Sequence, residues 1–199
     1  MALLQLSYDE LPSHLKSCFL CFSIYLEVCV INKEQLVYWW IGEGFVPPRS
    51  GRLITEIRED CFSELTNRCL IKAVDKTYNG TIYTCTIHDM VCELVLKIAG
   101  DDGLFKQYGT SCHHLGLTSN LNLRQLISNQ ELRALVSTTK TAEVNKIASS
   151  TAEELCKSHY LWVLDVSKSI FLETSLLGIL NQISSLKHLT YINLGNTHP

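Results

Sequence analysis

The sequence predicts an α+β fold in two parts: a mainly helical domain with one β-hairpin, followed by short, regularly spaced strands. Three observations predict it. Apolar residues recur at helical spacing in four segments of the first hundred residues. An Asn-Gly pair, Asn79-Gly80, lies between two strand-like runs, as in many β-hairpins. Beyond residue 110, similar apolar groups recur at steps of 29 and 28 residues, which is typical of a repeat protein.

The first two helices are expected between residues 7 and 44. Ser7 and Glu10 have the spacing of a capping box, so the first helix is expected to begin there. Its apolar stripe would be Leu11, Leu15, Phe19 and Phe22. Asn32 is expected to cap the second helix, with Gln35 reaching back to it. That helix would bury Leu36, Trp39 and Trp40 and end at Gly42 and Gly44.

A third helix, a hairpin and a fourth helix follow a loop that contains Pro47, Pro48 and Gly51. The third helix is expected from Leu53 to Arg68. Its apolar positions would be Leu53, Ile57, Cys61 and Leu65. Residues 69–74 and 81–87 are strand-like and are joined by a loop longer than two residues. The last helix would be ended by Gly100 and would bury Val91, Leu94, Val95 and Ile98.

Three helices, a hairpin and a closing helix make a winged-helix domain, a fold that often binds DNA. The third helix would be the recognition helix, and it is net acidic. Its basic residues are Arg52, Arg58 and Arg68, against Glu56, Glu59, Asp60 and Glu64. DNA phosphates would be repelled by such a face, so nucleic acid is an unlikely partner. A DNA-binding winged-helix protein with appended repeats is kept as the alternative hypothesis.

The second part is predicted to begin a leucine-rich-repeat solenoid. Its strands are expected at the runs that start at Leu132, Leu161 and Leu189, and Asn196 lies near the asparagine position of that pattern. Leu115 and Leu117 would lie on an irregular first strand. The predicted organisation is residues 1–100 for the winged helix, 101–112 for a linker and 113–199 for the repeats. Because the sequence stops within a repeat, we expect the solenoid to be truncated.

The composition agrees with a cytoplasmic globular protein. Hydrophobic residues make up 46% of the 199 residues, and the net charge is −3. No apolar run reaches the ~20 residues of a membrane span, and the N-terminus lacks the features of a signal peptide. Nine cysteines without a signal peptide are expected to be reduced core residues. Cys18 and Cys21 have metal-ligand spacing, but no second such pair follows, so no metal site is expected.

The sequence "TIHDMV", residues 86–91, contains the candidate site residues His88 and Asp89. Adjacent side chains point in different directions and no activated nucleophile accompanies them, so we expect no catalysis and no enzyme. Asp89 is placed to cap the last helix. A helix start favours a phosphate and disfavours imidazolium, so His88 is expected to be neutral and able to donate one hydrogen bond. A capped helix start with no ligand remains the simpler interpretation.

Two longer sequences carry a family resemblance. "LSYDELPSHLKSCFLCFSIY" at residues 6–25 and "LVYWWIGEGFV" at residues 36–46 resemble the winged-helix region of plant intracellular immune receptors. These are the nucleotide-binding, leucine-rich-repeat receptors, and the resemblance is to the type with an N-terminal coiled coil. "IHDMV" lies where that family has its Met-His-Asp motif, with Ile87 in place of methionine. The resemblance continues through the linker into the repeats.

The resemblance implies a molecular switch that acts in defence against pathogens. In this family ADP holds the receptor closed, and exchange for ATP opens it for oligomeric assembly. By position, His88 would approach the ADP β-phosphate, with Asp89 and Ile87 as neighbours. No phosphate-loop motif is present in these 199 residues, so the chain alone is expected to bind no nucleotide. Its expected partners are a nucleotide-binding core and protein ligands of the repeats.

One departure from the family pattern falls in the first loop. The family has Tyr-Pro-Glu-Asp where this sequence has Tyr25-Leu26-Glu27-Val28. Proline fixes φ and aspartate can stabilise a turn, so the loop is expected to be looser or differently set.

Overall fold

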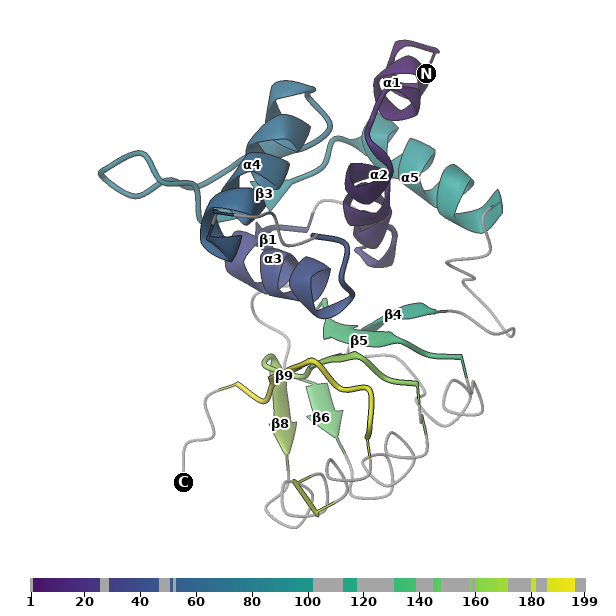
Figure 1. Ribbon diagram of the computed structural model, residues 1–199, viewed down its shortest axis with the longest axis vertical. Helices are drawn as coiled ribbons and strands as arrows, with labels where there is room; N and C mark the ends of the chain where they lie inside the picture. The colour runs from purple at the N-terminus through teal and green to yellow at the C-terminus, as the bar shows by residue number, and fades with distance from the viewer. Residues whose placement is uncertain are drawn as a thin grey trace. The chain divides into compact units, whose positions relative to one another are not determined.

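The chain consists of two compact units, Met1–Asp102 and Gly103–Pro199, in the computed structural model (Figure 1). The structure describes residues 2–25, 29–46, 51, 53–101, 113–117, 131–138, 145–147, 158, 160–171, 180–181 and 186–195. Several expectations lie outside these ranges: residues 26–28 of the first loop, 47–50 of the proline loop, 102–112 of the linker, Cys112, Cys156 and Asn196.

Unit 1 is mainly helical and carries a small antiparallel sheet. Its helices are α1 (Ala2–Asp9), α2 (Ser13–Leu20), the short 3-10 helix η1 (Cys21–Ile24), α3 (Lys33–Gly42), α4 (Ile54–Asn67) and α5 (Asp89–Asp101). Its strands are β1 (Ile31–Asn32), β2 (Lys72–Ala73) and β3 (Thr84–Thr86), in the order β1-β3-β2. Helix α2 packs against both α4 and α5. This arrangement of helices around a hairpin confirms the predicted winged-helix architecture.

The predicted capping box at the start of the first helix is wrong. Ser7 lies near the end of α1, where its hydroxyl donates to the Leu3 carbonyl at 3.1 Å, and α2 begins only after Pro12. Proline has no N–H and disfavours a helical residue before it, so the chain breaks into two helices there. The apolar stripe itself is confirmed, since its four members are all buried: Leu11, Leu15, Phe19 and Phe22.

Aromatic side chains form the centre of unit 1. Trp39, Trp40, Phe19 and Phe22 are fully buried, and the rings of Phe22 and Trp40 meet edge to face with centroids 6.5 Å apart. Truncating such a ring in a packed core costs about 3–5 kcal/mol. The two tryptophans are therefore core residues that fix α3 against the preceding helices.

Both predicted ends of α3 are confirmed. The Asn32 side chain accepts from the Gln35 N–H at 3.0 Å, which satisfies one free amide of the first turn. The helix ends at Gly42, and Gly44 follows with a φ of +72°, a conformation in which glycine is favoured.

The hairpin between α4 and α5 forms the wing. Lys72 pairs with Thr86 and Ala73 with Cys85, and Gly80 has a φ of +84° in the connecting loop. The loop is longer than two residues, as predicted, and it projects away from the helices in Figure 1. Strand β1 was not predicted; it is two residues long and exists because Ile31 and Asn32 pair with β3.

Helices α4 and α5 differ from prediction at their ends. Leu53 lies before the first residue of α4 and is 69% exposed, so its expected place in the core is wrong, whereas Ile57, Cys61 and Leu65 are buried. Gly100 lies inside α5 rather than after it. On α5, Val91, Leu94 and Val95 are buried and Ile98 is half-buried.

Unit 2 contains a four-stranded parallel sheet whose strands lie side by side in chain order. The strands are β4 (His114–Leu117), β5 (Ala134–Ser137), β7 (Val163–Asp165) and β9 (Tyr191–Asn193). Leu135 pairs with Leu164 and Leu164 with Ile192, so the paired positions are separated by 29 and 28 residues. Each predicted strand is therefore present at its predicted place. A second parallel pair, β6 (Asn145–Ile147) and β8 (Ser169–Phe171), was not predicted.

Leucines from successive strands form the core of unit 2. The buried cluster is Leu115, Leu117, Leu132, Leu135, Leu161, Leu164, Val166 and Leu186, with Leu189 and Leu194 packed against it. The apolar positions that recur in the sequence are thus the positions that touch one another in space.

The cysteines of the described residues are free thiols. Cys18, Cys21, Cys61, Cys85 and Cys92 are buried, Cys29 is half-buried and Cys69 is exposed. Among the described residues, no group of three or more His, Cys, Asp or Glu side chains is placed to hold a metal ion. Nor does any helix in those ranges have the length and apolar character needed to cross a membrane.

Candidate functional site

The predicted site lies where strand β3 passes into helix α5. Ile87 follows the strand and is buried, while His88 and Asp89 are both exposed. The buried strand end and the buried Val91 on the helix fix the short connection between them. The three residues predicted from the motif therefore lie together, with two of them accessible and Ile87 contributing to the core.

His88, rather than Asp89, occupies the capping position of α5. Its carbonyl accepts from the N–H groups of Val91 at 2.8 Å and Cys92 at 2.9 Å, and its ring Nδ1 accepts from the Met90 N–H at 3.4 Å. Asp89 is the first helical residue, where its negative charge is favourable to the helix dipole. The expectation that Asp89 caps the helix is wrong because the chain turns one residue earlier, as Ile87 enters the core.

The hydrogen bond from the Met90 N–H occupies Nδ1 of His88, so Nε2 is the ring nitrogen left to contact a ligand. When Nδ1 of a neutral imidazole accepts, its proton is on Nε2. Among the described residues, none accepts a hydrogen bond from that Nε2–H. The site thus combines one outward donor with the positive end of a helix, and both favour a bound anion such as a phosphate oxygen.

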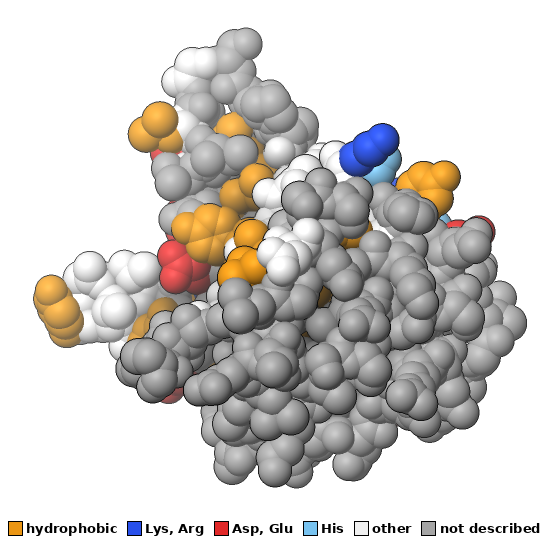
Figure 2. Space-filling model, turned by 90° about the horizontal axis from the view of Figure 1, so that it is seen from below, with side chains coloured by type: hydrophobic (Ala, Val, Ile, Leu, Met, Phe, Trp, Pro, Cys, Tyr) orange, Lys and Arg blue, Asp and Glu red, His pale blue; other side chains and the backbone are white. Residues whose placement is uncertain are grey.

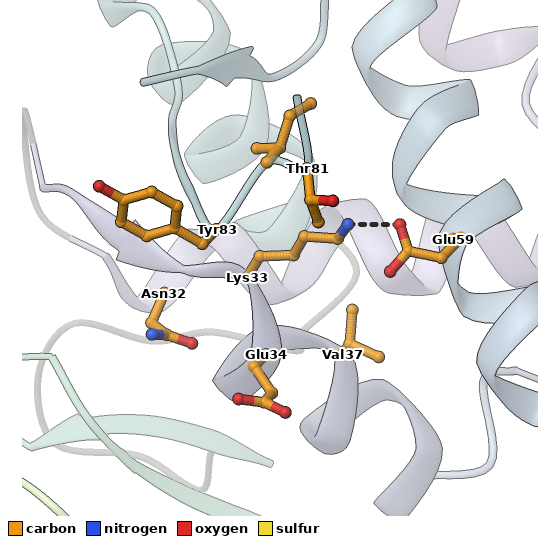
Figure 3. Close-up of a pocket in the computed structure, with 8 residues that line it drawn as sticks. Asn32, Lys33, Glu34, Val37, Glu59, Thr81 and Tyr83 are labelled. Atoms are coloured by element: carbon orange, nitrogen blue, oxygen red, sulfur yellow. Dashed lines mark hydrogen bonds and ion pairs between the residues drawn. The ribbon is translucent and has the colours of Figure 1, made fainter. Parts of the chain in front are cut away.

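A second feature of unit 1 is a cleft of about 210 Å³ between α3, α4 and the wing (Figure 3). It is lined by Asn32, Lys33, Glu34, Val37, Glu59, Thr81, Ile82 and Tyr83. Figure 3 shows the Lys33 side chain crossing the cleft toward Glu59. Three elements distant in sequence therefore contribute to one concave surface.

Lys33 is the unusual residue of this cleft. Its side chain is only 9% exposed, whereas its ion-pair partner Glu59 is 48% exposed. The ammonium also lies 4.8 Å from the centre of the Phe62 ring, a favourable cation–π distance. A buried charge is tolerated when it is paired in this way.

The cation of Lys33 also affects a neighbouring thiol. Burial raises the pKa of Cys85 to about 12, and the Lys33 ammonium opposes part of that rise. The Cys85 thiol is therefore neutral in the folded protein at physiological pH, and it is not an activated nucleophile.

This cleft was not predicted from the sequence. Lys33 opens a helix, where a lysine is usually exposed, and its burial depends on the wing and α4 closing over it. The Lys33 N–H donates to the Tyr83 carbonyl at 3.0 Å, so strand β1 and its pairing with the wing bring the parts together. A two-residue strand leaves no periodic pattern that could have predicted this contact.

Acidic side chains dominate helix α4. Glu56, Glu59 and Asp60 are exposed, and Glu64 pairs at 2.8 Å with Arg68, the residue that follows the helix. Figure 2 shows acidic and hydrophobic side chains together near the base of the projecting wing. A DNA-reading winged helix needs basic groups on its recognition helix, and this surface is of the opposite sign.

Comparison with known proteins first defines the class. Residues 24–95 match the family described as Disease resistance protein Winged helix domain. The matched range includes α3, α4, the wing and the first part of α5, and hence both His88 and the Lys33 cleft. Unit 1 is therefore a winged-helix domain of the disease resistance type.

The similarity to individual relatives extends further. The chain is 58% identical over its whole length to Disease resistance RPP13-like protein 4 of Arabidopsis thaliana, of which it spans 23%. It is 38% identical over 104 residues to ToMV resistance protein Tm-2(2) of Solanum lycopersicum, covering 51% of this chain and 12% of that protein. Probable disease resistance protein RF45 of Arabidopsis thaliana is 29% identical over 208 aligned positions, covering 96% of this chain and 20% of that protein.

The chain belongs to the plant disease resistance proteins, as the family match over residues 24–95 and the similarity of all 199 residues to the RPP13-like protein together show. It spans about a quarter of the length of the RPP13-like relative and smaller shares of the other two. The names of these three relatives describe resistance proteins and give no enzymatic activity.

Proposed function

We propose that this chain is the regulatory winged-helix region of a plant immune receptor together with the first leucine-rich repeats. In that role it contacts the nucleotide bound by a nucleotide-binding core, and it transmits the difference between the ADP and ATP states to the repeat region. It acts by contact and not by catalysis. The observation that carries the proposal is His88, exposed at the start of α5 within a domain that matches the disease resistance family.

The chemistry of the junction supports a phosphate contact by His88. The Met90 N–H donates to Nδ1, which leaves the Nε2–H as a ring donor that no described residue occupies. A ring N–H beside the free amides of a helix start can donate a hydrogen bond to a phosphate oxygen. ADP would supply the phosphate when the core is present. This chain would contribute only the His88 ring N–H and the start of α5 to the binding of ADP.

A nucleotide-binding core has to supply the rest of the site. Phosphates in such proteins are held mainly by phosphate-loop amides, a lysine and Mg²⁺. The residues described around His88 do not supply a phosphate loop, its lysine or a Mg²⁺ site. The chain alone is therefore expected to bind ADP negligibly, and ADP or ATP is a ligand only of the combined assembly.

The geometry of unit 2 supports the repeat part of the proposal. Four strands pair in parallel in chain order, and the last two steps between paired positions are 29 and 28 residues. Leucine-rich repeats have one strand per repeat of 20–29 residues, with their leucines packed in a continuous core. Such a solenoid presents a protein-binding surface, so we assign protein ligands to it. We also propose a cytoplasmic location for the receptor, which the resemblance to intracellular immune receptors implies.

The test combines the chain with a separately produced nucleotide-binding core from a disease resistance relative. We expect ADP to strengthen the association of the wild-type chain with the core, measured by calorimetric titration. His88→Ala should weaken that association by about tenfold, the loss expected for one hydrogen bond to a charged phosphate. Titration of ADP into the chain without the core should give no binding tighter than millimolar.

His88→Asn is the matched control, because asparagine also caps helices well but lacks the imidazole. It should preserve the stability of unit 1 and yet lose the ADP dependence. If His88→Asn and His88→Ala both left the ADP dependence unchanged, the switch role of His88 would be refuted. Micromolar ADP binding by the chain alone would contradict the need for a separate core.

The same preparations test the alternative of a DNA-binding protein. The acidic α4 predicts no salt-dependent binding of duplex DNA, measured by fluorescence anisotropy at low ionic strength. Binding that weakens steeply with added salt would favour the alternative.

A further inference from the structure

The Lys33 cleft is too small for a typical small-molecule ligand. Its volume of about 210 Å³ is below the ~300–1,000 Å³ of most ligand pockets. A single amino-acid side chain is a better match in size. The cleft also lies on a surface formed by α3, α4 and the wing, which a partner protein could cover without entering the core.

An anionic occupant does not suit this cleft, although a lysine lines it. The Lys33 ammonium already pairs with Glu59, and its other close contact is the Phe62 ring. Two first-turn amides of α3 are also used, since the Lys33 N–H donates to the Tyr83 carbonyl and the Gln35 N–H to the Asn32 side chain. The other donors that line the cleft, on Asn32, Thr81 and Tyr83, are neutral, so no unpaired positive charge is offered to a carboxylate or phosphate.

The charges of the cleft favour a cation instead. Two carboxylates, Glu34 and Glu59, accompany one ammonium, which leaves an excess of one negative charge. Glu34 is exposed and forms no ion pair with any other described residue. An incoming cation would therefore find one unpaired carboxylate and one that is half-exposed.

The walls of the cleft favour a cation with a long apolar stem. Val37, which is buried, and Ile82 line the cleft with aliphatic groups, and Tyr83 is 46% exposed. Methylene groups can lie along aliphatic walls while the charge stays near the rim. Guanidinium stacks on aromatic rings and binds carboxylates in a planar fork, which lysine cannot do.

We propose that this cleft is a docking site for an arginine side chain of a partner protein. The guanidinium pairs with Glu34, stacks on Tyr83 and leaves the Lys33–Glu59 pair intact. This site uses none of the groups that would contact a nucleotide, so it is a second recognition site in addition to His88.

Nuclear magnetic resonance titration of the 199-residue chain tests the proposal with N-acetyl-L-arginine amide as the probe. We expect amide resonances of Glu34, Val37 and Tyr83 to shift, with saturation in the millimolar range and weaker binding at high salt. N-acetyl-citrulline amide has nearly the same shape without the charge. It should bind about tenfold more weakly.

Variants assign the effect to the cleft. Glu34→Gln should weaken binding of the arginine probe by about two- to fivefold, as expected for one exposed ion pair, and Tyr83→Leu should weaken it further. Glu93→Gln is the matched control because Glu93 is an exposed carboxylate on α5 that does not line the cleft. It should change nothing.

Three results would overturn the proposal. Equal shifts with the citrulline and arginine probes would show that charge plays no part. Stronger binding of N-acetyl-glutamate amide would make the cleft an anion site. Shifts of the same resonances on raising the chain concentration without a probe would mean that a second copy of the chain occupies the cleft.

Discussion

Two glycines differ sharply in what they contribute to the fold. Gly195 has a φ of +74°, and a Cβ built on it would lie 2.5 Å from the Ser167 carbonyl oxygen. Gly100 lies in α5, and a Cβ there would meet nothing within 4 Å. The first position therefore requires glycine, and the second does not.

We predict opposite effects of alanine at these two positions. Gly195→Ala should lower the stability of unit 2 by at least about 1–2 kcal/mol, because alanine is strained in the left-handed region and would also collide with Ser167. Gly100→Ala should raise the stability of unit 1 by about 0.5–1 kcal/mol through helix propensity. Native-state hydrogen exchange measures the stability of each unit separately. A change of the same sign and size in the two variants would contradict the different roles given to the two glycines.

The residues of the candidate site were largely predictable, and their exact roles were not. The Thr86–Val91 sequence was sufficient to place His88 and Asp89 at a strand-to-helix junction. Which of them caps the helix depends on the residue at which the chain turns, and burial of Ile87 determines that. Helix ends are commonly uncertain by one or two residues when only the sequence is known.

At the scale of elements, a buried carboxylate joins strands β7 and β9. Asp165 is fully buried and accepts from the Ser167 N–H at 3.0 Å, the Ser167 hydroxyl at 2.6 Å, the Asn193 amide at 3.1 Å and the Tyr191 hydroxyl at 3.4 Å. Asn193 in turn accepts from the Gly195 N–H at 3.1 Å. The same group thus fixes both the strand pairing and the turns that leave it.

Asp165→Ala should destabilise the β7–β9 pairing by about 1–3 kcal/mol, since it leaves several half-buried donors without their shared acceptor. Protection of the Val166 amide, which donates to the Asn193 carbonyl, reports this pairing by hydrogen exchange. Asn193→Ala alone, and combined with Asp165→Ala, completes a double-mutant cycle. Strict additivity would mean that the two side chains do not act together.

Long periodic elements were predictable, while elements defined by partners were not. Helix α3, the central turns of α4 and α5, and the strands β4, β5, β7 and β9 were placed correctly because each carries its own apolar pattern. The stripe through Leu11 to Phe22 concealed the break at Pro12, because it continues in register across it. Strands β1, β6 and β8 are two or three residues long, and only their pairing in space defines them.

At the scale of the whole molecule, buried thiols link the stability of unit 1 to alkaline pH. Burial raises the pKa of Cys18 and Cys21 well above the ordinary value, and that of Cys85 to about 12. In the unfolded chain these thiols ionise near pH 9, as ordinary thiols do. Above that pH the unfolded state binds fewer protons than the folded state, so stability falls as pH rises.

We therefore predict that the free energy of unfolding of unit 1 decreases between about pH 9 and pH 11. Each buried thiol should add a slope of about 1.4 kcal/mol for each pH unit. Cys85→Ala should make the dependence shallower by that amount, whereas Val95→Ala should lower stability without changing its slope. Urea unfolding at several pH values measures stability and its pH slope. A Trp162→Phe background is used so that the emission comes from Trp39 and Trp40 of unit 1. The same pH slope in the wild type and in Cys85→Ala would refute the role of the Cys85 thiol.

The division of the chain into two units follows from its sequence patterns. A helical apolar period dominates the first hundred residues, and the spaced strands of the second part bury leucines among themselves. The Lys33 cleft could not be predicted in this way, because it arises where α3, α4 and the wing meet. Surfaces formed by several elements depend on tertiary contacts that no local pattern records.

The projecting wing has a consequence for how this protein can vary. Tyr78 at its tip is fully exposed, and the loop is closed by its own contacts, with the Thr77 N–H donating to the Thr81 carbonyl at 2.9 Å and the Gly80 N–H to the Thr77 carbonyl at 2.9 Å. Exposed loop tips tolerate substitution and insertion because little of the fold depends on them. Side chains at the tip can therefore be exchanged with little effect on the stability of unit 1, so selection can alter what the wing contacts while the core stays the same.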